Sequence, residues 1–375
     1  METAGEVPAP PGQMNNTALR HKIREYARQQ RKDLRTNTTD ALRFGLGQIK
    51  DKIMELENLG IKDVQGMAGR IKRRKHADTK DMYRLSHAFL QGNDNINAFA
   101  EVQGATQVII KELTGTHVQH QIEAAECLCN FSLGDAHVCE KITTMAGSYL
   151  VTLLNSQEPR LKRSCLWTLA NIIATCSKSA KTLLQMQLAT KLWKMYTTSS
   201  SDIDAYQEDT GICLYLIANH AASSITTEDR RHIARHLHMK QPTEPAADYY
   251  MFIVFQFEVV GLENNLCSAH FQHLLNYFMD NLKTNLSTST GKLHIIYGVR
   301  VLANMFATRP LIGRLDSQAD QLVSTLNQLF ALGDAGLTMD LMQLLKNIVD
   351  AQSMDNDFLL KQICVYASPV IVNSC

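Results

Sequence analysis

The amino-acid sequence predicts an all-α solenoid, in which similar helical units stack one after another. Two observations predict this fold. An asparagine occupies the same place in five apolar, helix-like segments, and these residues are Asn130, Asn171, Asn219, Asn304 and Asn347. They are separated by 41, 48, 85 and 43 residues, so the long interval corresponds to about two periods. The 375 residues also include only 8 Pro and 19 Gly, and 45% are apolar, which suits helices that bury a core.

The chain begins with a segment of unbalanced charge. Residues 1–18 are predicted to be disordered. Residues 17–75 contain sixteen Lys and Arg against seven Asp and Glu, whereas the net charge of the whole protein is +1. Leu and Ile recur at helical spacing in residues 40–64. Residues 19–78 are therefore predicted to form a basic, partly helical arm that binds a partner or folds back on the body.

The body, residues 79–375, is predicted to contain about six repeats. In one of them, residues 136–147 predict a short helix that ends at its glycine, and a second apolar helix follows directly. Residues 158–176 predict a long third helix with Pro159 in its first turn, where proline is tolerated. A short, a medium and a long helix in each unit favour an armadillo repeat over a two-helix HEAT repeat. We therefore expect an armadillo-repeat right-handed superhelix.

The unit between Asn219 and Asn304 shows the weakest repeat pattern. Its midpoint falls in the segment "YMFIVFQFEVV", where Phe252 and Gln256 are candidates for the corresponding pair of places. The exact register around residues 250–265 stays open at this point.

The asparagine series predicts a peptide-binding groove, because the third helices of such a stack line one concave face. Each amide can donate to one main-chain group of an extended peptide and accept from another. An aromatic residue four positions earlier, as Trp167 is to Asn171, lies one helical turn away and can pack against the stem of a Lys or Arg. The alternative is that these asparagines are surface or satisfied core residues that happen to align. The candidate groove residues are Asn130, Trp167, Asn171, Tyr215, Asn219, Asn304 and Asn347.

Two of these segments resemble the armadillo repeats of importin-α. The segment "HQIEAAECLCNFSLGD" matches the family pattern at Glu123, Ala124, Ala125, Leu128 and Asn130, and "CLWTLANIIA" matches it at Trp167 and Asn171. The resemblance implies a groove for the basic nuclear localisation signals of cargo proteins. It also implies an N-terminal segment that binds importin-β and competes for the groove. A protein of this kind works as a nuclear import adaptor in the cytoplasm and nucleus.

The basic arm resembles the importin-β-binding segment of that family in its density of Arg and Lys. The candidate residues are Arg20, Lys22, Arg24, Arg28, Arg31, Lys32, Arg35, Arg73, Arg74 and Lys75. For residues 19–35 the alternative is a solvated amphipathic helix. For residues 71–75 the alternative is an ordinary nuclear localisation signal or a patch that faces nucleic acid, the least favoured partner.

Residues 100–185 resemble more closely the transmembrane and coiled-coil domain-containing protein 6 family. The matching segments are Glu123–Leu128, Ser148–Leu150 and Leu166–Asn171. The membrane span in that family's name has no counterpart in the sequence, which contains no run of 18 apolar residues. We therefore expect a soluble, intracellular protein.

Departures from the importin-α pattern define the alternative function. Glu126 stands where the family has Trp, and Arg300 and Gln343 hold the corresponding places before Asn304 and Asn347. An arginine in the groove repels a basic ligand, whereas a glutamate attracts one. The alternative to an import adaptor is therefore an armadillo interaction scaffold that has lost nuclear-signal binding.

Several other classes of protein are disfavoured. The sequence has no P-loop, no G-x-S-x-G and no G-x-G-x-x-G after a strand, so an enzyme is not expected. His232 and His236 have the spacing of a chelating pair but lack an adjacent acid, so neither a metal nor a cofactor is expected. The nine Cys are scattered without a C-x-x-C motif, which predicts buried, reduced thiols.

Overall fold

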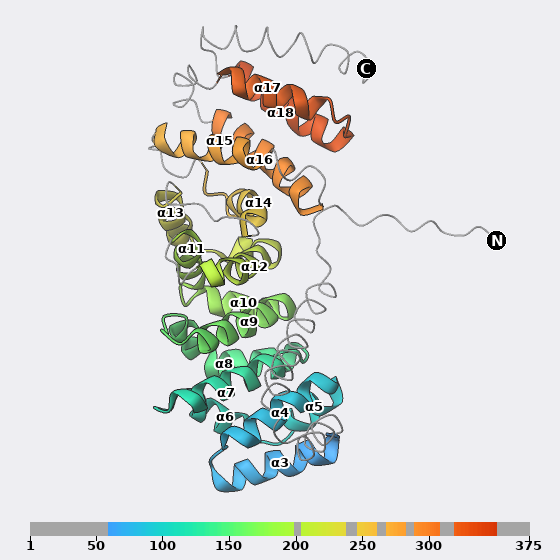
Figure 1. Cartoon of the computed structure of the whole chain (residues 1–375), viewed down its shortest axis with the longest axis vertical. Coiled ribbons are helices and arrows are strands. Elements are labelled where there is room, and N and C mark those ends of the chain that lie inside the picture. The colour runs from blue at the N-terminus through green and yellow to red at the C-terminus, as the bar shows by residue number, and fades with distance from the viewer. Residues whose placement is uncertain are drawn as a thin grey trace, which may run out of the picture. The chain divides into compact units, whose positions relative to one another are not determined.

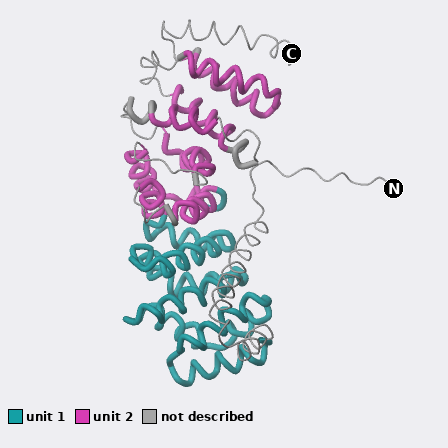
Figure 2. The backbone as a smooth tube through the Cα atoms, in the orientation of Figure 1, with its two compact units in different colours: residues 1–188, 219–221 teal, residues 189–218, 222–375 magenta. Residues whose placement is uncertain are grey.

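The computed structural model describes residues 59–198, 204–237, 246–260, 268–282, 289–307 and 319–350, and these contain helices, turns and loops but no strand. They divide into two compact units (Figure 2). Unit 1 is Met1–Leu188 with Asn219–Ala221, and unit 2 is Ala189–Ala218 with Ala222–Cys375. Seven candidates of the basic arm lie outside the described residues, namely Arg20, Lys22, Arg24, Arg28, Arg31, Lys32 and Arg35.

Unit 1 is built from eight described helices. They are α3 (Ile61–Arg74), α4 (Thr79–Gln91), α5 (Asn93–Ala100), α6 (Ala105–Leu113), α7 (Val118–Phe131), α8 (Ala136–Leu153), α9 (Pro159–Thr175) and α10 (Ser177–Leu184). In Figure 1, α4, α7 and α9 follow one another through the unit, and α4 packs on α7 and α7 on α9. Asp135 caps the start of α8. Pro159 is the first residue of α9, and its place in the first turn was predicted.

Unit 2 repeats the same arrangement. Its described helices are α11 (Leu188–Thr197), α12 (Asp204–His220), α13 (Thr227–Arg235), α14 (Tyr250–Gln256), α15 (Ser268–Leu282), α16 (Ser289–Ala307), α17 (Ala319–Phe330) and α18 (Ala335–Asp350). Two short 3₁₀ helices, η1 (Ala222–Ser224) and η2 (Ala246–Tyr249), join them. Helix α14 packs on α16 and α16 on α18.

The fold is an armadillo-type α-solenoid, as the sequence predicted. In the repeat formed by α5, α6 and α7, a longer helix follows two short ones and packs on the equivalent helix of the repeat before it. Within the described residues seven helices hold this third-helix place, rather than about six, and they are α4, α7, α9, α12, α14, α16 and α18. The additional repeat is the first one, which contains α3 and α4 and precedes the first asparagine of the series.

Gly147 does not end a helix, and this prediction was wrong. Residues 136–153 form the single helix α8, which continues through the glycine. The glycine serves close packing: a Cβ at Gly147 would lie 3.3 Å from Cδ2 of Leu183 on α10. The first and second helices of this repeat are therefore fused into one.

The boundary between the basic arm and the solenoid lies earlier than residue 78. Helix α3 packs against α4, α5 and α6, and it buries Val64, Met67, Ala68 and Ile71. It ends at Arg74 and is capped by Lys75, whose backbone is left-handed with φ 54° and whose amide donates to carbonyls of the last turn. The sequence misplaced the boundary because the charge of this segment masked its apolar stripe.

The cores of the two units are rich in aromatic contacts. Phe89, Phe99 and Phe131 meet in unit 1 with ring centroids 5.2 Å apart in each pair. In unit 2, Trp193 and Tyr250 lie 5.7 Å apart. The described cysteines carry free thiols, and all but half-buried Cys129 are buried, which agrees with the predicted burial of the cysteines.

Candidate functional site

Asparagine amides tie consecutive third helices of unit 1 together. Asn171 Nδ2 on α9 donates to the carbonyl of Cys129 at 3.1 Å and to Ser132 Oγ at 2.9 Å. Asn130 Nδ2 on α7 donates in the same way to the carbonyl and hydroxyl of Ser86, at 3.1 and 2.7 Å. The accepting carbonyls lie 42 and 44 residues earlier, which is one repeat. These asparagines therefore have a structural partner that recurs with the repeat.

The same bond recurs in unit 2. Asn347 Nδ2 on α18 donates to the carbonyl of Ala303 on α16, at 2.8 Å and 44 residues earlier. The carbonyl that is used belongs to the residue just before the preceding asparagine, Asn304 here and Asn130 in unit 1. Asn304 itself is exposed, and Asn219 is half-buried.

Trp167 and Asn171 are buried rather than open to a peptide. Only 4% of Trp167 and 3% of Asn171 is exposed. The prediction that Asn171 need not be buried is thereby corrected, because its amide is satisfied by α7 instead of by a ligand. Of the alternatives that the sequence left open, Asn171 therefore fits the one in which it is a buried core residue with its hydrogen bonds satisfied.

The residues four positions before the asparagines also link neighbouring repeats. Tyr215 is 3% exposed, and its ring lies 4.9 Å from that of Phe252 on the next third helix. This contact places Phe252 at the corresponding position of α14. Arg300 Nε donates to both carboxylate oxygens of Asp340 on α18 at 3.0 Å, and the guanidinium lies over the ring of Tyr297. The charge that was expected to repel a basic ligand is therefore offset within the protein.

The first repeat contains a pair that the sequence analysis missed. The carbonyl that Asn130 uses belongs to Ser86, so His87 holds the place of the asparagine on α4. Tyr83 lies four residues before it, and the two rings meet edge to face at 4.4 Å. Both side chains are half-buried. The sequence signal for this pair was the 43-residue separation of His87 from Asn130. A search for asparagine alone could not find it, because the residue at this place is a histidine.

An acidic pair lies on α7 beside these residues. Glu126 accepts a hydrogen bond from Arg160 of α9 at 2.8 Å. Glu123, one turn earlier, is half-buried and accepts a hydrogen bond from Gln119 Nε2 at 2.9 Å. Burial raises the pKa of Glu123, the charge of Glu126 raises it further, and the opposing effects of Arg160 and Gln119 are smaller. The ionised form of Glu123 is therefore disfavoured beside Glu126, and the bonded cation Arg160 lies on the Glu126 side of the pair.

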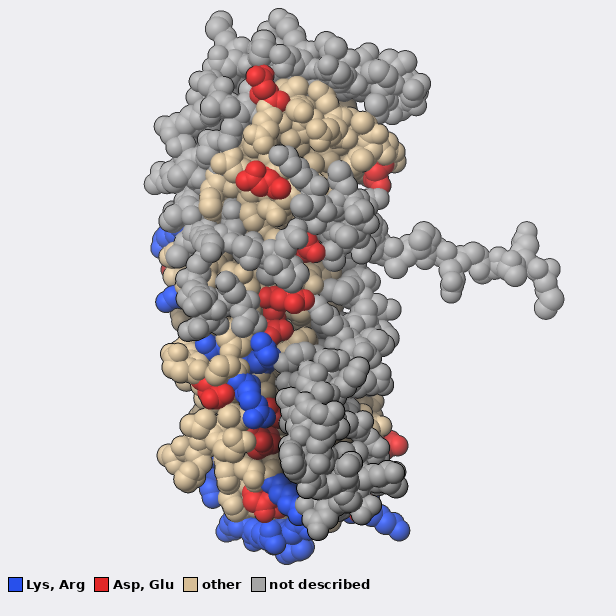
Figure 3. Space-filling view, viewed as in Figure 1, with Lys and Arg blue, Asp and Glu red and all other residues tan. Residues whose placement is uncertain are grey.

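Basic side chains gather at the α3 end of unit 1 (Figure 3). Arg73, Arg74 and Lys75, candidates for the importin-β contact, are exposed there. Arg74 approaches the buried carboxylate of Asp81 at 3.7 Å, and Arg70 bonds the same carboxylate at 2.8 Å. The three candidates thus stand at the end of a folded helix, and not on the separate arm that was predicted.

Metal-ligating residues come together at one place within the described ranges. His76, Glu112 and His120 each offer a ligand atom, and these atoms lie within 4.8 Å of one another. The pair His232 and His236 stacks at 4.4 Å, with Nδ1 of His236 bonded to its own helix, and it joins no such group in the described chain. No described helix combines the length and the apolar character that a membrane span requires.

Comparison with known proteins shows the fold. No family model matches the chain, so the resemblance to the transmembrane and coiled-coil domain-containing protein 6 family gains no support. An engineered protein solved by the Northeast Structural Genomics Consortium is similar, with a TM-score of 0.57 and 16% identity over 95% of this chain and 79% of that one.

Two designed proteins are similar at lower scores. The designed armadillo repeat protein YIII(Dq)4CqI has a TM-score of 0.41 and 16% identity, over 76% of this chain and 99% of its own. A second design, YIII(Dq.V1)4CPAF, was solved in complex with the peptide (KR)4, and it has a TM-score of 0.42 and 15% identity over the same shares. At such identities a likeness concerns architecture and not ligands.

Proposed function

We propose that this protein is an interaction scaffold whose third-helix face in unit 1 binds an extended, basic peptide segment of a partner protein. The acidic pair on α7 is the observation that carries the proposal. Arg160 bonds Glu126, whereas Glu123 stays half-buried beside that second carboxylate. A Lys or Arg side chain of a ligand would relieve the repulsion between the two carboxylates and complete their hydrogen bonds.

The spacing of the third helices suits an extended ligand. Packed helices lie about 8–10 Å apart, and an extended chain advances about 3.3 Å per residue, so roughly three peptide residues span one repeat. Half-buried polar side chains recur on this face with the repeat, as His87 and Asn130 do on α4 and α7. The hydrogen bonds of the asparagines hold the third helices at this spacing. The asparagines therefore affect peptide binding indirectly, by fixing the distance between the helices.

The test is binding of a fluorescent, arginine-rich octapeptide to the full-length protein, followed by anisotropy. We expect Glu123→Gln with Glu126→Gln to weaken binding at least about tenfold, because two charge-assisted contacts are lost. The matched control is Glu101→Gln, an exposed glutamate at the end of α5, which should leave the affinity unchanged. Equal binding by all three proteins, or preference for an acidic peptide, would contradict the proposal.

The narrower form of the proposal is a nuclear import adaptor, present in cytoplasm and nucleus. It is supported by the density of basic residues before residue 76 and by the exposure of Arg73, Arg74 and Lys75. Sub-micromolar binding of the full chain to purified importin-β, measured by calorimetry at near-physiological salt, is the expected result. A variant with these three residues changed to Ala should bind more weakly. If the unaltered chain does not bind importin-β, the import-adaptor proposal is contradicted, whereas the proposal of a peptide-binding scaffold is unaffected.

A further inference from the structure

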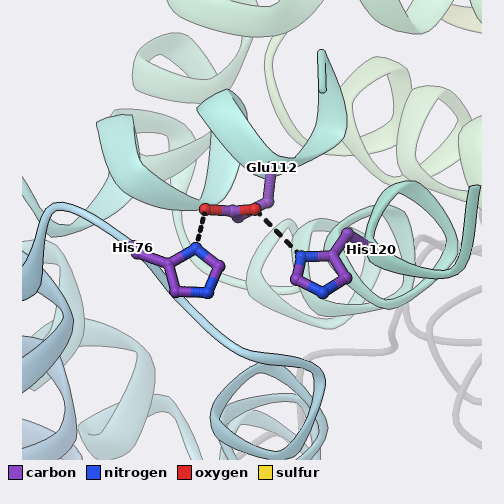
Figure 4. A group of neighbouring side chains, drawn as sticks. All are labelled: His76, Glu112 and His120. Carbon is purple, nitrogen blue, oxygen red and sulfur yellow. Dashed lines mark hydrogen bonds and ion pairs between the residues drawn. The ribbon is translucent and has the colours of Figure 1, made fainter. Parts of the chain in front are cut away.

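Two histidines from separate segments of unit 1 converge on the carboxylate of Glu112 (Figure 4). Glu112 lies on α6, His76 follows the end of α3, and His120 is in the first turn of α7. His76 Nδ1 lies 2.8 Å from one carboxylate oxygen, and His120 Nδ1 lies 3.0 Å from the other. The two rings are 5.6 Å apart and nearly parallel. His120 lies on α7 one turn before Glu123, but the cluster involves neither Glu123 nor Glu126 and does not depend on the peptide proposal.

The surrounding backbone holds this arrangement in place. Only 11% of the Glu112 side chain is exposed, and its Oε1 also accepts the amide of Ala77 at 3.4 Å. Burial raises the pKa of Glu112, but the bonds from His120, His76 and Ala77 outweigh it, and the net effect lowers the pKa. The carboxylate is therefore an anion that is fixed in position, which a cation site needs.

The lysine next to Glu112 in the sequence is directed away from the carboxylate. Lys111 Nζ donates to the carbonyl of Lys75 at 3.3 Å rather than to Glu112. The last carbonyls of α3 end beside His76, and the C-terminal end of a helix favours a cation.

We infer that His76, Glu112 and His120 form a binding site for a divalent transition metal, with Zn²⁺ the ion that fits best. Two imidazoles and a carboxylate are a common ligand set for Zn²⁺, and nitrogen ligands disfavour Mg²⁺ and Ca²⁺. In a tetrahedral zinc site the ligand atoms lie about 3.4 Å apart. Atoms already within 4.8 Å therefore need to move by less than about 1 Å each, and His76, half exposed, has room to turn.

A fourth ligand is available beside the other three. His117 is exposed and precedes His120 by three residues, so the two lie on one side of the first turn of α7. Their ring centroids are 5.8 Å apart. Either His117 or a water molecule completes the coordination. The metal joins the end of α3 to α6 and α7, which fastens the first two repeats to each other.

A purely structural cluster is the competing explanation, and metal titration separates the two. The full-length protein is titrated with Zn²⁺ in competition with a chromophoric chelator. Loss of an outer partner weakens metal binding by about 10- to 100-fold, so we expect loss of two direct ligands in His76→Ala with His120→Ala to cost at least about 100-fold. Zn²⁺ should raise the melting temperature of the unaltered protein and not that of the double variant.

Two controls keep the result specific. His232→Ala with His236→Ala removes a histidine pair from unit 2 and should leave the tight site intact. Co²⁺ replaces Zn²⁺ in the second measurement, and a tetrahedral spectrum without thiolate bands is expected, because thiolates are not ligands here. If the first double variant does not fold, Glu112→Gln is used, since it keeps the shape of the side chain, with an acceptor for one imidazole and a donor for the other, and removes the charge. The inference is overturned if the unaltered protein binds no Zn²⁺ tightly, if the variants bind as tightly, or if Co²⁺ reports thiolate ligands.

Discussion

We expect Trp167→Ala to lower the free energy of unfolding by about 3–5 kcal/mol, the usual cost of truncating a buried tryptophan. The residue is 4% exposed on α9, in the middle of unit 1, so its loss leaves a cavity between packed helices. Urea unfolding of the full chain, followed by far-ultraviolet circular dichroism, measures the change. Helical repeats can unfold in steps, so the transition with the lowest midpoint carries the effect.

Two further variants calibrate this result. Tyr149→Ala removes an aromatic side chain of unit 1 that is 48% exposed, and it should change stability by less than about 0.5 kcal/mol. Asn171→Ala removes the amide that donates to the carbonyl of Cys129 and to the hydroxyl of Ser132, at a cost of about 1–3 kcal/mol, and the bond from Ser132 Oγ to that carbonyl remains. If Trp167→Ala instead melted like the unaltered protein and lost only peptide binding, the ring would have to be an exposed groove residue.

The burial of this pair changes how binding data are interpreted. The sequence pattern predicts that changing Trp167 and Asn171 to Ala abolishes peptide binding while the fold stays intact. The structure predicts that the same double change destabilises unit 1, because both side chains are part of its core. Lost binding in that variant would therefore report unfolding. Glu123 and Glu126 are the better probes, since their side chains are only partly buried.

The fold was predictable because its signal is repeated. The recurrence of Asn130, Asn171 and Asn347 marks third helices, and in the structure each of them bonds the helix one repeat earlier. A bond that depends on the stacking of repeats produces a regular sequence spacing. The solenoid could therefore be read from the spacing, although the purpose of the asparagines could not.

The candidate sites were harder to predict, because they combine residues with no regular spacing. His76 and Glu112 are 36 residues apart, and only the packing of α3 beside α6 brings them together. The start of the solenoid was missed for a related reason. Val64 and Ile71 form a buried stripe within a segment whose basic residues dominate its composition. A solvated face and a buried face coexist on such a helix, and composition records only their sum.

Acidification is expected to destabilise unit 2 through His294. The side chain is fully buried on α16, its ring lies 5.8 Å from that of Tyr277, and neither nitrogen meets a hydrogen-bond partner among the described residues. Burial lowers the pKa of His294 from 6.5 to about 4. Between these two values the unfolded chain takes up a proton that the folded chain refuses. Stability is therefore full above about pH 6.5 and falls as the pH drops, by up to about 1.4 kcal/mol per pH unit.

The comparison that isolates this histidine is between variants. Carboxylates elsewhere also titrate, so the slope of the unaltered protein alone is not decisive. His294→Phe keeps a ring in the same apolar surroundings and removes the titrating group, and its stability should fall less steeply between pH 6.5 and 4. His137→Gln, a change at an exposed histidine of α8, should keep the slope of the unaltered protein. Equal slopes for His294→Phe and the unaltered protein would mean that His294 is protonated in the folded state, with an acceptor at one of its nitrogens.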